Sequence, residues 1–181
     1  MHYLPMSNLL VNNLLELIKM AANQYDFTSK LFHWVMALLI PGLLFVGFTG
    51  IGFQWHKSFG MVAGIVILAR ILWRLWHRAP PYPLSVKPIQ IVAGRAAHFG
   101  LYFLMLMMPI LGVLGAAYSG RPLLFFNIPL PVFSPNKLLA HELFYWHGVL
   151  AWGMLVLIIL HLSASILHII RRDGVIKRMW F

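Results

Sequence analysis

The stretch HGVLAWGMLVLIILHLSASILH, residues 147–168, is an apolar run with a histidine at each end and His161 between them. It is long enough to cross the hydrocarbon core of a bilayer, which takes about 20 apolar residues in a helix. Ionisable side chains are costly inside a membrane and are usually kept there for function. The stretch therefore predicts a transmembrane helix in which His147, His161 and His168 need a chemical role.

The whole chain shares this apolar character. Of its 181 residues, 61% are hydrophobic and only 10% are charged, which excludes an ordinary soluble domain. Its 14 Lys and Arg outnumber 4 Asp and Glu, but they lie in short clusters between apolar runs, so nucleic acid is not expected as a partner. The chain has no cysteine, which excludes disulfides, iron–sulfur clusters and covalent haem attachment.

Four segments are long and apolar enough to span a membrane, at residues 31–53, 58–76, 97–118 and 145–170. Basic residues gather in the connection between the second and third segments and after the fourth. By the positive-inside rule, these parts face the cytoplasm. The sequence therefore predicts an all-α, integral membrane four-helix bundle with both termini in the cytoplasm.

The first residues of the chain differ from the rest. We expect residues 1–24 to be an N-terminal extension and residues 25–181 to be the four-helix domain. The pattern LLVNNLLELIKMAA has an apolar face at helical spacing, which favours an amphipathic helix on the membrane surface. A disordered extension is the alternative. The segment lacks the basic leader and the cleavage site of a signal peptide.

The spacing of four histidines arranges them in two pairs. On a helix, the fourteen residues from His147 to His161 place both within roughly 40° of one face and about 21 Å apart along the axis. His33 opens the first span at the inner side, and His56 opens the second span at the outer side. Depth therefore pairs His56 with His147 and His33 with His161. Two stacked pairs of this kind could each hold an iron porphyrin between facing helices.

Other interpretations of these histidines remain open. A single histidine in a bundle is more often a hydrogen-bonded core residue than a ligand, but four at matching depths favour ligands. Zinc fits less well, because its sites want three or four ligands, often with a carboxylate or thiol, and the predicted spans have no carboxylate. A transporter or channel with a histidine proton relay would need acidic residues in the spans or an inverted repeat, and neither is evident.

Three further residues accompany the paired histidines. Gly60 and Gly64 follow His56 on its own side of the helix, where small residues admit either a porphyrin edge or a closely packed neighbouring helix. Arg70 is fourteen residues after His56, at the level of the inner pair. Its guanidinium suits a haem propionate, and an anchor at the membrane interface is the alternative.

Several stretches, in this order and spacing, resemble the bacterial cytochrome b561 family of dihaem four-helix membrane cytochromes. They are LFHW, HKSFG followed by Arg70, AAHFGLYFLMLMMPILG, HGVLAW, LHLSASILH and RRDGVIKRM. The resemblance covers about residues 25–181. It implies a multi-pass protein of the bacterial cell inner membrane with two non-covalent haem b groups. His33 and His161 would be the axial ligands of the inner haem, and His56 and His147 those of the outer haem.

The resemblance also implies electron transfer between an extracytoplasmic donor and the quinone pool. Some members of the family oxidise superoxide and reduce ubiquinone, and others are the membrane subunit of a larger oxidoreductase. We therefore expect an electron carrier or a superoxide:quinone oxidoreductase, with no catalytic residue assigned. Its expected partners are membrane lipid, quinone, and superoxide or a periplasmic redox protein, with a homodimer also open.

Two histidines outside the ligand set lie near the inner face. We expect His98 and His168 to hydrogen-bond a quinone carbonyl or a haem propionate. The alternative for each is an interfacial histidine with a water or backbone partner. Many relatives have a second histidine directly after the position of His168, whereas this chain has Ile169.

Overall fold

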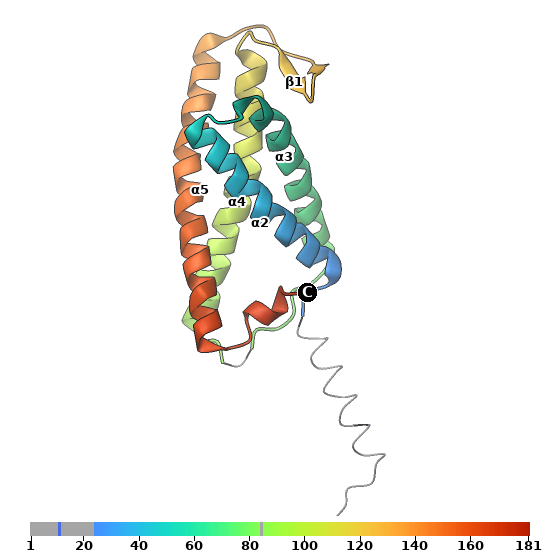
Figure 1. Cartoon of the computed structure of the whole chain (residues 1–181), viewed down its shortest axis with the longest axis vertical. Coiled ribbons are helices and arrows are strands. Elements are labelled where there is room, and N and C mark those ends of the chain that lie inside the picture. The colour runs from blue at the N-terminus through green and yellow to red at the C-terminus, as the bar shows by residue number, and fades with distance from the viewer. Residues whose placement is uncertain (1–10, 12–23, 84) are drawn as a thin grey trace, which may run out of the picture.

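The computed structural model describes residues 11, 24–83 and 85–181. Its main elements are four long helices that run up and down as a bundle (Figure 1): α2 (Phe27–Thr49), α3 (Phe53–Trp76), α4 (Pro88–Tyr118) and α5 (Lys137–Arg171). Each is long and apolar enough to cross a membrane. The predicted four-helix membrane bundle is confirmed. The surface helix expected within residues 1–24 stays a prediction, because only Val11 and Gln24 of that segment are described.

Three of the helices, α3, α4 and α5, extend beyond the predicted apolar segments, whereas α2 begins earlier but ends at Thr49, before the predicted end at residue 53. α4 begins at Pro88 and α5 at Lys137, well before the predicted starts at residues 97 and 145. Hydropathy marks only the part of a helix that contacts lipid tails, whereas backbone hydrogen bonds continue a helix into the aqueous edge. Consequently His98 lies well inside α4 rather than at its start.

Helix caps fix the ends of the first and last spans. Asp26 precedes α2, and its carboxylate accepts hydrogen bonds from the Ser29 backbone N–H at 2.9 Å and from the Ser29 hydroxyl at 2.7 Å. Gly50 ends α2 with a φ of 74°, a left-handed conformation that glycine adopts without strain. Asn136 caps α5 by accepting from Leu139 N–H at 3.0 Å. Such caps satisfy backbone N–H groups that the first turn of a helix leaves free.

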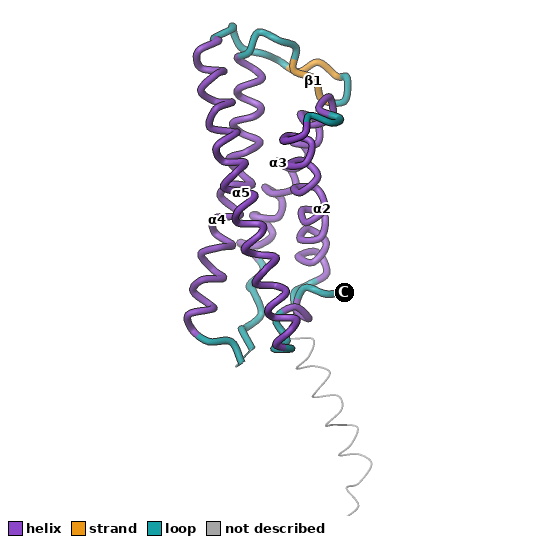
Figure 2. Tube along the Cα trace, turned by 60° about the vertical axis from the view of Figure 1, so that its left-hand side comes forward, coloured by secondary structure: helices purple, strands orange, loops and turns teal. Residues whose placement is uncertain are grey.

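α4 lies beside α5, and α2 lies beside α3 (Figure 2). α3 also contacts α4. An apolar core at mid-height combines α2, α4 and α5, and its buried members are Leu44, Leu101, Leu104 and Met154. Many outward-facing side chains remain exposed, such as Leu38 at 77% and Leu75 at 74%. This distribution is expected where the outer faces of the helices contact lipid rather than water.

A short β-hairpin lies in the connection between α4 and α5. Strands β1 (Leu123–Phe125) and β2 (Ile128–Leu130) pair antiparallel around a two-residue turn at Phe126 and Asn127, both with positive φ. Phe126 N–H donates to the hydroxyl of Ser58 on α3 at 3.0 Å, which seats the hairpin on the end of that helix. The hairpin was not predicted from the sequence, because its Phe-Asn turn lacks the usual Asn-Gly or Asp-Gly signal.

The C-terminal segment folds back under the opposite end of the bundle (Figure 1). It contains the 3-10 turn η1 (Ile176–Arg178). Tyr25 N–H donates to the Arg178 carbonyl at 3.1 Å, and Trp34 Nε1 donates to the Met179 carbonyl at 3.0 Å. The start of α2 and the end of the chain thus lie together. We call this end, which the charge pattern places in the cytoplasm, the inner end, and the hairpin end the outer end.

Candidate functional site

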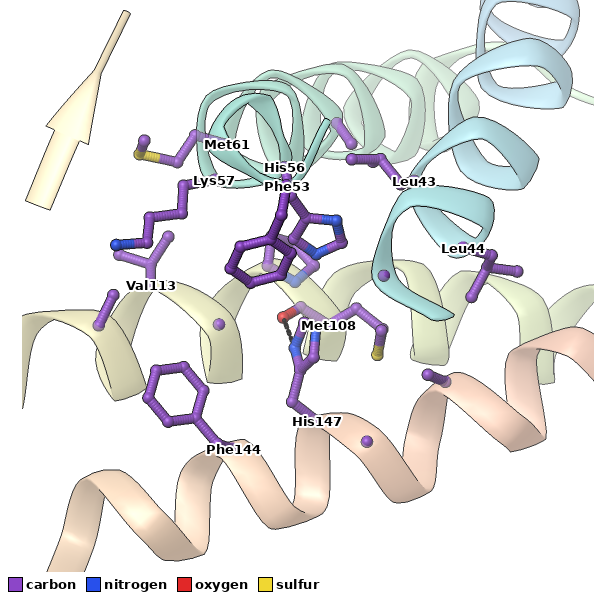
Figure 3. Close-up of a pocket in the computed structure, with 18 of the residues that line it drawn as sticks. Leu43, Leu44, Phe53, His56, Lys57, Met61, Met108, Val113, Phe144 and His147 are labelled. Carbon is purple, nitrogen blue, oxygen red and sulfur yellow. Dashed lines mark hydrogen bonds between the residues drawn. The ribbon is translucent and has the colours of Figure 1, made fainter. Parts of the chain in front are cut away.

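The outer histidine pair faces across the bundle as its spacing predicts. The rings of His56 on α3 and His147 on α5 have centroids 6.1 Å apart with an interplanar angle of 78° (Figure 3). A metal–imidazole nitrogen bond measures about 2.0 Å, so two rings that bind one metal from opposite sides have centroids roughly 6 Å apart. The separation therefore fits a shared axial site.

The surroundings of each ring hold it in place. His147 Nδ1 lies 3.0 Å from the Met108 carbonyl (Figure 3), which accepts its hydrogen and leaves Nε2 with a free lone pair. Phe53 stacks on His56 with centroids 5.5 Å apart. His56 Nδ1 is buried and finds no hydrogen-bond partner among the described residues. An unpaired buried nitrogen costs about 1–3 kcal/mol, and metal binding is one common use of such an imidazole.

Two glycines leave room for these rings. A Cβ at Gly47 of α2 would lie 3.3 Å from His56 Cε1, and a Cβ at Gly112 of α4 would lie 3.1 Å from His147 Cε1. Both distances are shorter than ordinary contacts between carbon atoms, about 3.5–4.0 Å. Glycine at these positions therefore lets neighbouring helices come close enough to support each imidazole from the side.

A cavity of about 730 Å³ surrounds the outer pair and is bounded by all four helices. Cofactor pockets usually measure about 300–1,000 Å³. Gly60 lines the cavity, and a Cβ there would meet no atom within 4 Å, so Gly60 borders open space rather than a closely packed helix. A Cβ at Gly64 would instead lie 3.1 Å from Pro109, so Gly64 serves the close packing of α3 on α4. The largely apolar walls, the paired imidazoles and the volume fit a b-type haem.

The inner pair repeats the arrangement at the other end. The rings of His33 on α2 and His161 on α5 have centroids 6.3 Å apart with an interplanar angle of 63°. Arg70 lies beside them, with Nη2 3.4 Å from His33 Nδ1, and its Nε donates to the hydroxyl of Tyr102 at 3.0 Å. Arg70 thus lies at the level of the inner histidine pair. Its contact with Tyr102 was not predicted.

His98 joins the inner pair from α4. Its ring centroid lies 5.3 Å from that of His161, with an interplanar angle of 72°, and its side chain is exposed at the edge of the pair. Within the described part of the chain, no group of three or more histidine or acidic side chains has the arrangement of a metal site. His98 is therefore placed beside a two-histidine site, where it could contact a ligand or substrate.

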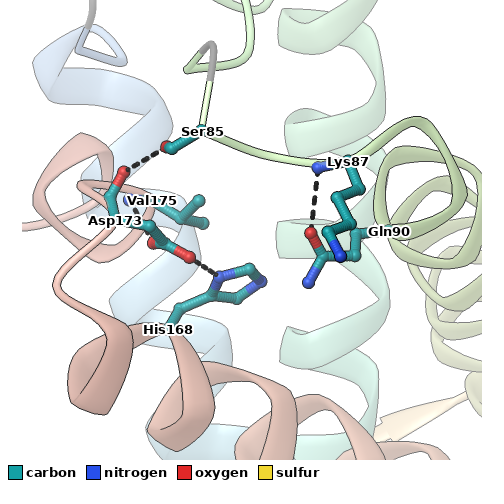
Figure 4. Close-up of polar contacts among 6 residues, drawn as sticks. All are labelled: Ser85, Lys87, Gln90, His168, Asp173 and Val175. Atoms are coloured by element: carbon teal, nitrogen blue, oxygen red, sulfur yellow. Dashed lines mark hydrogen bonds and ion pairs between the residues drawn. The ribbon is translucent and has the colours of Figure 1, made fainter.

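His168 has a partner that was not predicted from the sequence. Its Nδ1 lies 2.5 Å from Oδ2 of Asp173 (Figure 4). Burial alone would raise the pKa of Asp173, but the hydrogen bonds from His168 and from Val175 N–H outweigh it and hold this pKa below its usual value. Since Nδ1 is engaged, only Nε2 of His168 remains for the expected quinone or propionate contact. The signal in the sequence was the lone acid in RRDG after the helix.

Comparison with known proteins adds to this geometry. The family model of prokaryotic cytochrome b561 matches residues 24–181. Over 174 residues the chain is 30% identical to cytochrome b561 homolog 2 of Escherichia coli (strain K12), covering 86% of this chain and 90% of that protein. Over 158 residues it is 29% identical to the probable superoxide oxidase CybB of Yersinia pestis, covering 81% and 90%.

The match spans the whole four-helix domain and every histidine of the two pairs. It agrees with four helices that can cross a membrane and with half-buried, facing imidazoles at two levels. The chain therefore belongs to the prokaryotic cytochrome b561 family, whose members are haem b proteins of membrane electron transfer, and it is a multi-pass protein of the bacterial inner membrane.

Proposed function

We propose that this chain is a dihaem b-type cytochrome that carries electrons between an extracytoplasmic donor and the quinone pool. The observation that supports it best is the presence of two facing imidazole pairs with centroids 6.1 Å and 6.3 Å apart. His56 and His147 would hold the outer haem, and His33 and His161 the inner one. When bound, the haems supply one-electron redox centres inside the apolar bundle.

The chain places the two pairs at different depths. His147 and His161 both lie on α5, and their fourteen-residue separation corresponds to about 21 Å along the helix axis. The hydrocarbon core of a bilayer is about 30 Å thick. One pair therefore lies toward each membrane face, and together they divide the distance that an electron must cross.

Side chains around the pairs tune each site. The Met108 carbonyl orients His147 through Nδ1, and such a partner sets the tautomer and basicity of a ligand. Arg70 brings a permanent positive charge to the inner pair, and Tyr102 keeps it there. The outer cavity walls carry many apolar side chains, such as Leu43 and Met154, which keep water from the site and strengthen its electrostatic interactions.

The outer cavity also indicates the class of donor. Lys57, Arg121 and Lys137 line the same cavity as the outer histidine pair, and a cleft lined with positive charge concentrates small anions. We propose superoxide as the donor, because the Yersinia pestis relative is named a probable superoxide oxidase. A periplasmic redox protein with an acidic surface is the alternative, and the chain would then be the membrane subunit of a larger oxidoreductase.

We place the quinone at the inner pair, next to His98. The exposed imidazole of His98 lies 5.3 Å from the His161 ring, centroid to centroid. It can donate a hydrogen bond to a quinone carbonyl and pass on a proton that quinone reduction consumes. His168 lies further along α5, and its Nε2 could relay protons from the inner face.

The first test of this proposal is the haem content of the purified protein. We expect a reduced spectrum of low-spin b-type haem and a haem-to-protein ratio near two. Superoxide should then reduce the protein under anaerobic conditions, superoxide dismutase should abolish this reduction, and a soluble quinone should reoxidise the protein. A colourless protein made with ample haem, or a ratio near one, would contradict the dihaem proposal. Reduction that is insensitive to superoxide dismutase would contradict superoxide as donor.

A further inference from the structure

Three arginines and two tyrosines alternate at the inner end of the bundle. The guanidinium of Arg178 lies over Tyr25 and Tyr82, with its Cζ 5.3 Å and 5.0 Å from the ring centroids. Arg74 lies over Tyr25 at 5.3 Å, and Arg95 lies over Tyr82 at 5.7 Å. All four distances fall within the roughly 6 Å of a cation–π contact. We call these five residues the arginine ladder.

The ladder joins segments that lie far apart in the sequence. Tyr25 precedes α2, Arg74 lies in the last turn of α3, and Tyr82 belongs to the connection before α4. Arg95 lies in α4 and Arg178 in the C-terminal segment. Two backbone carbonyls accept further hydrogen bonds from the ladder, that of His77 from Arg74 at 3.1 Å and that of Pro80 from Arg178. The guanidinium groups are thus held in a defined arrangement.

The described residues provide no anion to balance this charge. The carboxylate of Asp26 accepts from Ser29 and from Trp73, and Asp173 pairs with His168. Across residues 24–83 and 85–181, no ion pair links an acidic residue to Arg178. Arg178 is only 6% exposed, and its Nε has no hydrogen-bond partner among the residues that the structure describes. A buried cation without a counter-charge is costly, so the ladder needs an anion to complete it.

An apolar face of α4 leads to the ladder from the membrane side. Phe99 and Phe103 lie one turn apart on one side of the helix and are 76% and 51% exposed. Helical residues three or four apart lie on one face, and an apolar face exposed at membrane depth contacts lipid chains. Arg95 borders this face. Positive charge and lipid-facing surface therefore meet at the inner rim of the bundle.

We propose that the arginine ladder binds the phosphate of an anionic phospholipid of the inner leaflet, with its acyl chains along the exposed face of α4. Guanidinium groups form strong, charge-assisted hydrogen bonds to phosphate oxygens. Basic pockets between transmembrane helices on the cytoplasmic side are suited to anionic head groups. A free phosphate has the same charge chemistry, but it would not use the apolar face. This site is independent of the haem ligands.

The test is the thermal stability of the haem-loaded full chain in a non-ionic detergent. Added phosphatidylglycerol should raise the melting temperature in a saturable way, whereas phosphatidylcholine and inorganic phosphate should not. Arg95→Gln should weaken the apparent affinity for phosphatidylglycerol about fivefold, the typical share of one basic residue near anionic lipid. Lys177→Gln is the matched control, because Lys177 is an exposed cation of the same end outside the ladder, and it should respond as the unmodified protein does.

A second variant tests the stacked geometry. Arg178→Lys keeps the charge but loses the planar group between Tyr25 and Tyr82, so we expect weaker lipid binding in protein that retains its haem spectrum. If Arg178→Lys does not fold, the lipid response of Arg95→Gln alone tests the proposal. An unchanged response of Arg95→Gln would overturn the proposal, as would an equal response to phosphatidylcholine. A full shift with inorganic phosphate would show a site for free phosphate instead.

Discussion

The guanidinium of Arg70 on α3 lies beside the imidazole of His33 on α2, with Nη2 3.4 Å from Nδ1. Tyr102 on α4 keeps it there through a 3.0 Å hydrogen bond to Nε. Arginine stays protonated under all ordinary conditions. A permanent positive charge is therefore built into the inner histidine pair, where partial burial limits the screening that water and salt provide.

This contact predicts the effect of Arg70 on the inner haem. Arg70→Leu should lower the reduction potential of the inner haem by roughly 50–100 mV, equivalent to about 1–2 kcal/mol for one electron. The reason is that a nearby cation favours the reduced state of the haem, which is the more negative one. Redox titration followed by optical spectroscopy measures the change. Arg70→Lys, which keeps the charge, should retain most of the potential. If the reduction potential of the inner haem is unchanged in folded Arg70→Leu, Arg70 serves only as an anchor at the membrane interface.

Replacing either histidine of the outer pair should remove one of the two proposed haems. His56→Ala or His147→Ala should lower the haem-to-protein ratio from two to about one, since a low-spin site of this kind needs both axial ligands. The redox transition of the inner haem should persist. His141→Ala is a suitable control, because the exposed His141 carries no ligand role in the proposal. A ratio that stays near two would show that the replaced histidine is not a required ligand.

The contact between Gly112 and His147 predicts opposite effects of the same substitution at two glycines of α4. In Gly112→Ala, the new Cβ would lie 3.1 Å from His147 Cε1 and 3.3 Å from Nδ1, which should displace the ring and weaken outer haem binding. Crowding of this kind costs about 1–3 kcal/mol. In Gly94→Ala, the new Cβ would have no atom within 4 Å, so this substitution should stabilise the helix by about 0.5–1 kcal/mol. The melting temperature and haem content of the two variants test these expectations. If Gly112→Ala and Gly94→Ala changed both quantities equally, the predicted contact with His147 would be contradicted.

The position of His98 predicts a defect in quinone reduction without loss of haem. His98→Phe preserves a planar ring next to His161 but removes the hydrogen-bonding nitrogens. We expect a ratio of two haems and at least about a tenfold slower transfer to quinone, a typical minimum for the loss of a general acid or base. Stopped-flow reoxidation by a soluble quinone measures it. Normal quinone turnover with a shifted haem potential would instead assign His98 to a propionate.

The pair of His168 and Asp173 predicts a pH-dependent stability. The pKa of Asp173 is held below its usual value, so its carboxylate stabilises the fold above the unfolded-state pKa of about 3.9, and this stabilisation is lost as the pH falls further. Asp173→Asn should cost about 1.5–3 kcal/mol at pH 7, the range for hydrogen bonds to charged groups. The difference in melting temperature from the unmodified protein should shrink below about pH 4. A difference that is constant with pH would contradict a charged partner for His168.

The four spans and the two levels of the paired histidines were determined by the sequence itself. Both follow from local rules, because an apolar run of sufficient length must form a helix in a membrane. The turn and rise per residue then set where His147 and His161 lie on α5. The helix ends were less predictable, since α4 begins at Pro88, beyond the apolar part that hydropathy detects.

Only the tertiary structure decided which side chains meet between segments. The pairing of His168 with Asp173 requires the chain to turn back after α5, at Arg172 with its positive φ. The arginine ladder requires the C-terminal segment to bring Arg178 between Tyr25 and Tyr82, more than ninety residues away in the sequence. Helical periodicity is encoded within a few neighbouring residues, whereas these contacts depend on how the helices pack and where the tail docks. Apart from the acid of RRDG, which lies five residues after His168, no local pattern of the sequence contains that information.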